Sequence, residues 1–590
     1  MAKDQETLWR RWTTPLAALV LATAGAAAYS NSLAGPFVFD DVRSIVSNPS
    51  LRNLARLDEV LMPPPEAVTV TGRPVANLTF ALNYRLGGEA VRGYHLVNLA
   101  VHLLAGLTLF GAARRALLLP AWRERFGRAA TGLALAVALV WMLHPLQTES
   151  VTYIVQRTES LAGLFYLVTF YAVVRAIGSE RPGAWHATAI VACALGMATK
   201  ETVVSAPLVM LLFERVAARR PLKEVLRCRW PLYAGLAGTW VLLAAVMATS
   251  WNRYQTAGFG LGMDWSDYAC TQFGNIVYYL RLSFWPHPLV IDYGAPLATT
   301  TAQIVPSAAV VGLLVAATAV AWWRWPGIGW LGMWFFATLA PSSSIVPLVN
   351  QTAAEHRMYL ALAAVVALVI LGGYAAWQRL AARGGATASP PGRAWRAAPV
   401  VLVLAMAGAL GATTYVRNID YQSSLALWRA TAKDCPDSFR AQLNLGAALS
   451  DTGDYAGAMQ AHHNALRLQP HSEKAYYNRG MTYRLTGQLK ESIDDFTRAV
   501  RLRLDYPQAW FNRGNDFRDL GRYEEAVRDY SMAIGFNPYH ADSYQNRALC
   551  YYHLRRYDEA WADIARVEAF GGTPSPELVA NLTAASGRPR

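Results

Sequence analysis

Apolar runs separated by short polar segments fill the first two thirds of the chain. The runs lie at residues 15–28, 94–113, 131–146, 161–177, 185–198, 202–213, 231–250, 305–323, 327–346, 358–377 and 399–415. A helix that crosses a bilayer needs about 20 mostly apolar residues. Although several runs are shorter, together they predict about eleven membrane spans. Residues 270–285 carry Arg281, which favours an interfacial helix over a further span.

Beyond residue 415 the apolar runs give way to a period of 34 residues. Small residues and prolines recur at this period: Gly446, Gly480, Gly514 and Ala548; Ala458, Ser492, Ala526 and Ala560; Pro436, Pro470 and Pro538. This pattern looks like the tetratricopeptide repeat, in which small side chains let two helices approach and proline ends the second. We therefore predict an all-α chain, with a polytopic membrane domain at 1–416 and an α-solenoid of about four and a half repeats at 417–590.

Arginine and lysine cluster in alternate loops of the predicted membrane domain. The clusters precede the first run and recur at 114–128, 215–229 and 379–396. The positive-inside rule places these loops and the N-terminus in the cytoplasm, and an odd number of spans places the repeats outside. If the first run is instead a signal peptide, the loop after it still lies outside.

The composition agrees with a membrane protein. Hydrophobic residues make up 54% of the chain, charged residues 16%, and the net charge is +14. Because the basic clusters that anchor the topology account for much of this excess, no nucleic-acid partner is expected. The five cysteines are scattered, so neither a disulfide framework nor a cysteine zinc site is predicted.

Polar and charged residues concentrate in the loops that are predicted to face outside. They are Asp40 and Asp41 in the first outer loop, Glu149 and Arg157 in the second, Lys200 and Glu201 between the fifth and sixth spans, and His356, Arg357 and Tyr359 at the tenth. Because they share one face of the membrane, we expect them to form one site. Such a set offers acid–base chemistry together with anion binding.

The adjacent carboxyls Asp40 and Asp41 are the candidates for a general base that accepts a proton from a hydroxyl. Neighbouring side chains point in different directions, so one of the two is expected to act. The other then orients it, caps the following helix, or helps to hold a divalent metal such as Mg²⁺ or Mn²⁺. Their mutual repulsion predicts a raised pKa for one of them.

The cations near this pair are candidates for binding a phosphate group. They are Arg157, Lys200, His356 and Arg357, with Glu149, Glu201 and Tyr359 in support. Structural roles are the alternatives: Lys200 and Glu201 as interfacial anchors, and Arg157 in an ion pair with Glu149 or Glu159.

The recurrent asparagines Asn444, Asn478, Asn512 and Asn546 are the candidates for contact with an acceptor peptide in the solenoid groove. A solvent-facing or helix-packing role is the alternative.

A lipid-carried group is the donor that the sequence favours. The chain has neither a Gly-rich phosphate loop nor a soluble nucleotide fold, and nucleotide sugars are made in the cytoplasm. A polyprenyl phosphate delivers an activated sugar and a leaving group at the membrane surface, where the acids and cations are predicted to lie.

An ordered set of motifs then identifies a family. "GPFVFDDVRSIVSNPSL", "GRPVANLTFALNYRLGG", "GYHLVNLAVHLLAGL", "HPLQTESVTYIVQRTESLAGLFYL", "KETVVSAPLVMLLFE" and "AEHRMYLAL", followed by the repeats, resemble the transmembrane and tetratricopeptide-repeat O-mannosyltransferases. The resemblance implies a GT-C glycosyltransferase that transfers mannose from a polyprenyl phosphate to Ser or Thr of proteins, with inversion. It assigns the acidic pair of the first outer loop to Asp40 and Asp41. The Arg- and Ala-rich composition suggests a bacterial inner-membrane member.

Two other functions remain open at this point. In the first, the acceptor is a cell-surface glycan or lipid, and the repeats recruit an assembly partner. In the second, the protein is a non-enzymatic membrane scaffold that displays the repeats, in which case the outer acids are dispensable. The number of outer polar motifs argues against the scaffold, because an anchor needs only one span.

Overall fold

The structure is a computed structural model that describes residues 2–250, 263–344, 346–348, 351–384 and 393–588. Within these ranges all regular elements are helices, so the predicted all-α class is confirmed. The chain divides into two compact units, Met1–Leu427 and Trp428–Arg590.

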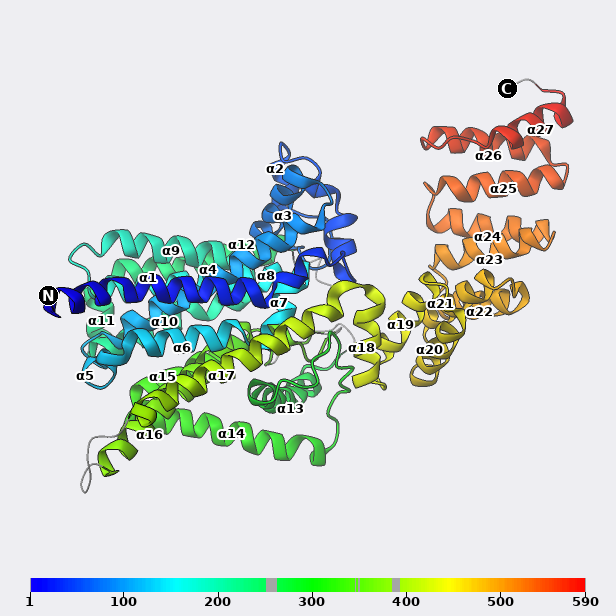
Figure 1. The fold of residues 1–590 in the computed structure, drawn as a ribbon. Coiled ribbons are helices and arrows are strands. Elements are labelled where there is room, and N and C mark those ends of the chain that lie inside the picture. The colour runs from blue at the N-terminus through cyan, green and yellow to red at the C-terminus, as the bar shows by residue number, and fades with distance from the viewer. Residues whose placement is uncertain (1, 251–262, 345, 349–350, 385–392, 589–590) are drawn as a thin grey trace. The chain divides into compact units, whose positions relative to one another are not determined.

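The first unit is a bundle of long helices connected by shorter ones (Figure 1). The long helices are α1 (Ala2–Ala28), α4 (Val91–Leu117), α6 (Ala130–Met142), α8 (Arg157–Ile177), α9 (Gly183–Met197), α10 (Ala206–Ala218), α12 (Trp230–Ser250), α13 (Trp265–Phe284), α14 (Thr301–Arg324), α15 (Pro326–Leu339), α16 (Met358–Gly384) and α17 (Arg393–Arg417). The remaining α-helices are α2 (Leu57–Leu61), α3 (Pro74–Gly87), α5 (Arg123–Phe126), α7 (Thr148–Thr152) and α11 (Leu222–Cys228). Single helical turns, 3-10 or π in geometry, are η1 (Ser30–Ala34), η2 (Val42–Val46), η3 (Pro49–Leu51), η4 (Gly127–Ala129), η5 (Pro145–Gln147), η6 (Ile154–Gln156), η7 (Glu201–Ser205), η9 (Glu355–Arg357) and η10 (Asn418–Gln422).

Helices suited to a membrane make up most of this bundle. Among the described residues, seven helical segments are long and apolar enough to cross a bilayer: Val91–Leu117, Arg123–Met142, Ile154–Ile177, Trp230–Thr249, Thr301–Arg324, Glu355–Ala381 and Ala397–Gln422. Each predicted apolar run coincides with a bundle helix over most of its length, although residue 345 of the run 327–346 lies outside the described residues. The chain is therefore a membrane protein with several apolar helices.

The two ends of the bundle differ in composition. Figure 1 shows the start of α1 with α5 and α11 at one end, and α2, α3 and α7 at the other. The first end carries the arginine-rich loops, whereas the second carries the acidic and basic residues predicted to form a site. The alternation of basic and polar loops in the sequence thus corresponds to two opposite ends of one bundle.

Buried tryptophans help to fix the helices against one another. The indole N–H of Trp141 donates to the carbonyl of Tyr359 at 2.9 Å, and that of Trp334 donates to Leu360 at 2.9 Å. Polar atoms inside an apolar bundle need such partners, because neither lipid nor packed side chains replace water.

The second unit is a solenoid of paired helices. After α18 (Ser424–Asp434), the pairs are α19 (Phe439–Asp451) with α20 (Tyr455–Leu468), α21 (Glu473–Leu485) with α22 (Leu489–Leu502), α23 (Pro507–Asp519) with α24 (Tyr523–Phe536), and α25 (Ala541–His553) with α26 (Tyr557–Ala569), followed by α27 (Pro576–Ser586). Glycine is required at positions 480 and 514, where the two helices of a repeat approach closely. A Cβ at Gly480 would lie 3.0 Å from the ring of Phe496, and one at Gly514 would lie 2.9 Å from the ring of Tyr530. The predicted repeat array is confirmed.

Each of the last three repeats contains an arginine–aspartate pair that joins its two helices. Arg479 pairs with Asp495 at 2.7 Å, Arg513 with Asp529 at 2.6 Å, and Arg547 with Asp563 at 2.7 Å. The arginines of the last two pairs also bind the preceding repeat, through the hydroxyls of Thr497 and Ser531. In the first repeat the corresponding positions are Leu445 and Ala461, so it lacks this pair.

We expect the repeat unit to lose stability in mild acid because of His462. This residue occupies the position of Phe496 and Tyr530 in later repeats, is fully buried, and has no hydrogen-bond partner for either ring nitrogen. Burial, together with the charge of Arg479 and with His463, lowers the pKa of His462 from 6.5 to about 4. As the pH falls below 6.5, the unfolded chain therefore binds a proton that the folded chain does not, which costs about 2 kcal/mol at pH 5 relative to pH 7.

Urea unfolding of the fragment Trp428–Arg590, followed by circular dichroism at several pH values, measures this loss. His462→Phe should remove most of the difference in unfolding free energy between pH 7 and pH 5. An equal dependence in both proteins would mean that other groups cause it.

Candidate functional site

The acidic pair lies in a tight turn that leads into η2. Phe39 has φ +48°, in the left-handed region that aromatic residues rarely adopt. Asp41 is fully buried; its Oδ2 accepts the N–H of Val38 at 3.0 Å, and its Oδ1 accepts the N–H of Val155 at 2.7 Å. Asp40 is only half-buried. Asp41 thus ties the turn to the segment before α8, instead of capping the helix that follows it.

The two carboxyls also differ in their electrostatic surroundings. Burial raises the pKa of Asp41 to about 8, and the charge of Asp40 adds to this, whereas the N–H groups of Val38 and Val155 and the charge of Arg157 lower it. The buried carboxyl of Asp41 therefore favours its neutral form near neutral pH. The more exposed Asp40 is the member of the pair that solvent or a substrate reaches.

Arg157 is sealed at the start of α8. Its guanidinium donates to the side-chain oxygens of Asn98 and Asn83, both at 2.6 Å, and to the carbonyl of Tyr94 at 3.0 Å. It also lies 4.4 Å from the ring centre of Phe80. Because the side chain is fully buried and its donors meet neutral oxygens, it joins α3, α4 and α8.

The ion pairs of this region differ from those weighed from the sequence. Arg157 pairs with neither Glu149 nor Glu159. Glu159 instead binds the ammonium of Lys200, with 2.5 Å between Oε2 and Nζ. Glu149 accepts from Nδ1 of His356 at 2.8 Å and from its backbone N–H at 2.9 Å. Glu159 and Glu149 thus each bind a predicted cation, but these cations are Lys200 and His356 instead of Arg157.

Lys200 does not act as an interfacial anchor. Its side chain is only 7% exposed, and a snorkelling lysine would instead extend into water. Glu201, the next residue, is 37% exposed and binds Arg73, with 3.1 Å between the guanidinium and Oε1. Arg73 was not singled out from the sequence, although it stands in the quoted "GRPV" motif. Only the fold reveals it, because its partner is distant in the chain.

Two further predicted residues, Arg357 and Tyr359, form hydrogen bonds with other parts of the bundle. Arg357 is buried and donates to the carbonyl of Thr352 at 2.8 Å and to that of Gln351, so it fixes the segment before η9. Tyr359 lies inside the bundle, where its hydroxyl is 2.9 Å from Nδ1 of His102 on α4.

Polar residues from separate loops converge at one end of the first unit. Besides Glu149, the charged groups that act on the His356 ring include Lys200, Glu159, Arg357 and Arg73. Tyr153 lies within electrostatic reach of Asp40, Asp41 and Glu149, and its hydroxyl accepts the backbone N–H of Asp40 at 2.9 Å. The turn that carries Asp40 and Asp41 therefore lies at the same end of the first unit as the cation cluster, which consists of Arg73, Lys200, His356 and Arg357. This arrangement suits proton transfer beside an anion-binding site.

A divalent metal fits the acidic pair poorly. Both oxygens of Asp41 accept backbone N–H groups, and the described residues contain no cluster of three or more His, Cys, Asp or Glu placed to hold a metal ion. A protein-held Mg²⁺ or Mn²⁺ would need several oxygen ligands.

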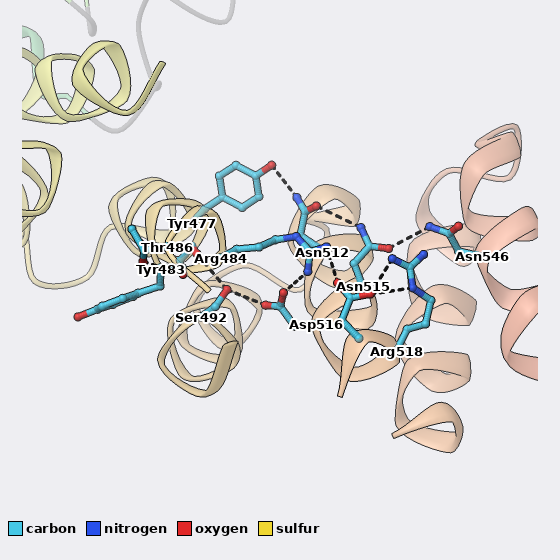
Figure 2. Close-up of polar contacts among 12 residues, drawn as sticks. Tyr477, Tyr483, Arg484, Thr486, Ser492, Asn512, Asn515, Asp516, Arg518 and Asn546 are labelled. Carbon is cyan, nitrogen blue, oxygen red and sulfur yellow. Dashed lines mark hydrogen bonds and ion pairs between the residues drawn. The ribbon is translucent and has the colours of Figure 1, made fainter. Parts of the chain in front are cut away.

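The predicted asparagines of the repeats fall into two groups. Figure 2 shows the amides of Asn512, Asn515 and Asn546 in a row that ends at the hydroxyl of Tyr477. Asn512 donates to Tyr477 at 2.9 Å, and Asn546 donates to Asn515 at 2.9 Å. The helix-packing role therefore applies to Asn512 and Asn546.

Asn444 and Asn478 occupy the equivalent positions on α19 and α21. In the described part of the chain their side-chain amides make no hydrogen bond between repeats, and both residues are half-buried. Their amides thus remain available to another molecule.

Comparison with family models agrees with the repeat unit. Models of the tetratricopeptide repeat match residues 410–462, 473–506 and 507–540. Among solved structures, MamA is 23% identical and covers 25% of this chain and 86% of its own, with a TM-score of 0.24, which is too low to support an argument.

Curated relatives support the resemblance stated from the motifs. Protein O-mannosyl-transferase TMTC1 of Homo sapiens is 34% identical over 169 residues, which are 27% of this chain and 18% of the relative. Protein O-mannosyl-transferase TMTC3 of Mus musculus is 33% identical over 181 residues, 30% of this chain and 18% of the relative. The chain thus spans about a fifth of the length of these relatives. The predicted resemblance is confirmed.

Proposed function

We propose that this membrane protein is a glycosyltransferase of the GT-C type that acts on proteins. It transfers a sugar, mannose by the resemblance, from a polyprenyl phosphate to Ser or Thr hydroxyls at the extracytoplasmic face. The observation that carries this proposal is the half-buried carboxyl of Asp40 at the end of a membrane bundle that also carries Arg73, Lys200 and His356. The similarity to relatives named protein O-mannosyl-transferases supports it.

In the proposed reaction Asp40 is the general base. Its carboxylate takes the proton of the acceptor hydroxyl while that oxygen attacks the anomeric carbon of the sugar. The bond between this carbon and the phosphate oxygen breaks on the opposite face, so the configuration inverts and the lipid phosphate leaves as an anion. Asp41 positions Asp40 through its bonds to Val38 and Val155.

The cation cluster neutralises the phosphate in this proposal. Among the residues predicted for that role, the geometry favours Lys200, because a charged ammonium on a flexible stem can shift from Glu159 to an arriving anion. His356, held by Glu149, borders the same region. Arg157 and Arg357 support the site by fixing the segments that carry it.

Sugar transfer by the purified protein in lipid tests the proposal. Radiolabelled polyprenyl-phosphate mannose is supplied with a mixture of extracytoplasmic proteins, and labelled protein is detected after electrophoresis. Alkali-labile label on Ser or Thr would support the assignment. An absence of transfer from several polyprenyl-phosphate sugars would overturn it and favour the scaffold.

We expect the repeats to select the acceptor through Asn444 and Asn478. Replacing both by Ala should raise the KM for a protein acceptor about five- to tenfold without changing kcat, because two amide hydrogen bonds are lost from binding only. A short hydroxyl acceptor serves as the control, since it does not reach the repeats. If the variant retained the wild-type KM for every protein acceptor, a glycan or lipid acceptor would become the better assignment.

A further inference from the structure

Arg73, just before α3, is more exposed than the buried cations Lys200, Arg157 and Arg357 at the same end of the bundle. Arg73 is 14% exposed and Lys200 is 7% exposed, whereas Arg157 is fully buried. Arg73 donates to the carbonyl of Thr69 at 2.8 Å and to Glu201 at 3.1 Å. Glu201 is itself 37% exposed, so this pair borders solvent-accessible space.

The bonding of Arg157 argues against a direct contact with phosphate. Its donors are taken by Asn83, Asn98 and Tyr94 in a buried position, and an arriving anion would have to break these bonds and leave the amide oxygens unpaired. Arg73 could exchange the accessible carboxylate of Glu201 for another anion while it keeps its bond to Thr69. Because Glu201 is partly exposed, water weakens its attraction to Arg73, which favours this exchange.

Arg73 and Lys200 are also brought together by the backbone. Pro74 begins α3, and the N–H of Val75 donates to the carbonyl of Ala198 at 3.2 Å. This bond fixes the start of α3, just after Arg73, against the turn that carries Lys200. Both cations act on the ring of His356.

We propose that Arg73 and Lys200 together hold the phosphate group of the lipid donor. The planar guanidinium of Arg73 binds two phosphate oxygens, and the ammonium of Lys200 binds as a point charge. Glu201 and Glu159 hold the two cations in place before the donor arrives, and both acids compete with it for them. This inference rests on the proposed function and adds Arg73, which the sequence did not single out, to the donor site.

Binding, not transfer, provides the test. The full chain in lipid nanodiscs is titrated with polyprenyl monophosphate, with polyprenol and with inorganic phosphate, and bound ligand is quantified by native mass spectrometry. Wild type should bind the lipid phosphate more tightly than either comparison ligand. Arg73→Gln should weaken that binding about ten- to a hundredfold, because a charge-assisted hydrogen bond is lost. Arg73→Lys keeps the charge but loses the planar guanidinium that binds two oxygens at once, so its loss of affinity should be intermediate.

Glu201→Gln separates a phosphate contact from a structural role. If Arg73 binds phosphate, this variant binds the lipid phosphate as well as wild type or better, because a competing anion is removed. If Arg73 only holds Glu201, Glu201→Gln reproduces the defect of Arg73→Gln and overturns the inference. Arg56→Gln is the matched control, since Arg56 lies in the same segment between α1 and α3 and also pairs with an acid, Glu59, but is 57% exposed.

The remaining outcomes separate this inference from the proposed function. Wild-type binding that Arg73→Gln leaves unchanged overturns the role of Arg73 alone. Wild type that binds polyprenol as tightly as polyprenyl monophosphate overturns the donor class, and this inference with it. Melting temperatures of all variants show whether they fold. If Arg73→Gln does not fold, the binding measured for Arg73→Lys provides the test.

Discussion

Replacing Asp40 by Asn is expected to reduce sugar transfer by about 10²–10⁴-fold, the usual contribution of a general base. The amide has nearly the same shape as the carboxyl but cannot take the proton of the acceptor hydroxyl. Because Asp40 is only half-buried, folding should be unaffected. Initial rates of label transfer, measured with saturating donor and compared with donor binding by the same variant, give the result.

Asp41→Asn is the matched comparison for this experiment. The two oxygens of Asp41 each accept a backbone N–H, whereas an asparagine side chain has one oxygen and an NH₂ group that cannot accept. We expect this variant to lose transfer together with a drop in melting temperature. Full transfer by Asp40→Asn, with transfer abolished in a stably folded Asp41→Asn, would reassign the base to Asp41.

Arg157→Gln is expected to lower the free energy of unfolding by on the order of 4 kcal/mol. The substitution leaves the side-chain oxygens of Asn98 and Asn83 buried without a charged donor and separates α3 from α8. Unfolding in mixed micelles by increasing denaturing detergent measures the loss. Arg157→Lys should lose nearly as much, because one ammonium lacks the geometry of the guanidinium.

The control for Arg157 is Arg85→Gln, an exposed arginine on α3, which should change stability by less than about 0.5 kcal/mol. Normal stability of Arg157→Gln combined with lost binding of polyprenyl monophosphate would show that this arginine holds the phosphate instead.

The fold was largely predictable, because it depends on patterns within each segment. Apolar runs predict the bundle helices, and a period of 34 residues predicts the repeats, including the glycines that face Phe496 and Tyr530. The sequence also predicted that Asp40 and Asp41 have different roles, since adjacent side chains point in different directions. Which one is buried depends on Val155, a residue far along the chain.

The partners of the charged residues were not predictable in the same way. Arg157 binds Asn83 and Asn98, Glu159 binds Lys200, and Arg73 binds Glu201, in each case across a wide separation in sequence. A single sequence predicts that acids and cations gather on one face of the membrane, but it does not show which loops meet. The same limit applies to the asparagine row, where the period was visible but the bond to Asn515 was not.

The missing arginine–aspartate pair of the first repeat has a consequence for motion. In a solenoid each repeat is stabilised by its own contacts and by those with its neighbours. With Leu445 and Ala461 in place of the pair, we expect α19 and α20 to open at a lower cost than the helices of later repeats. Backbone amides there should exchange with solvent sooner, and a protease should cleave this repeat first.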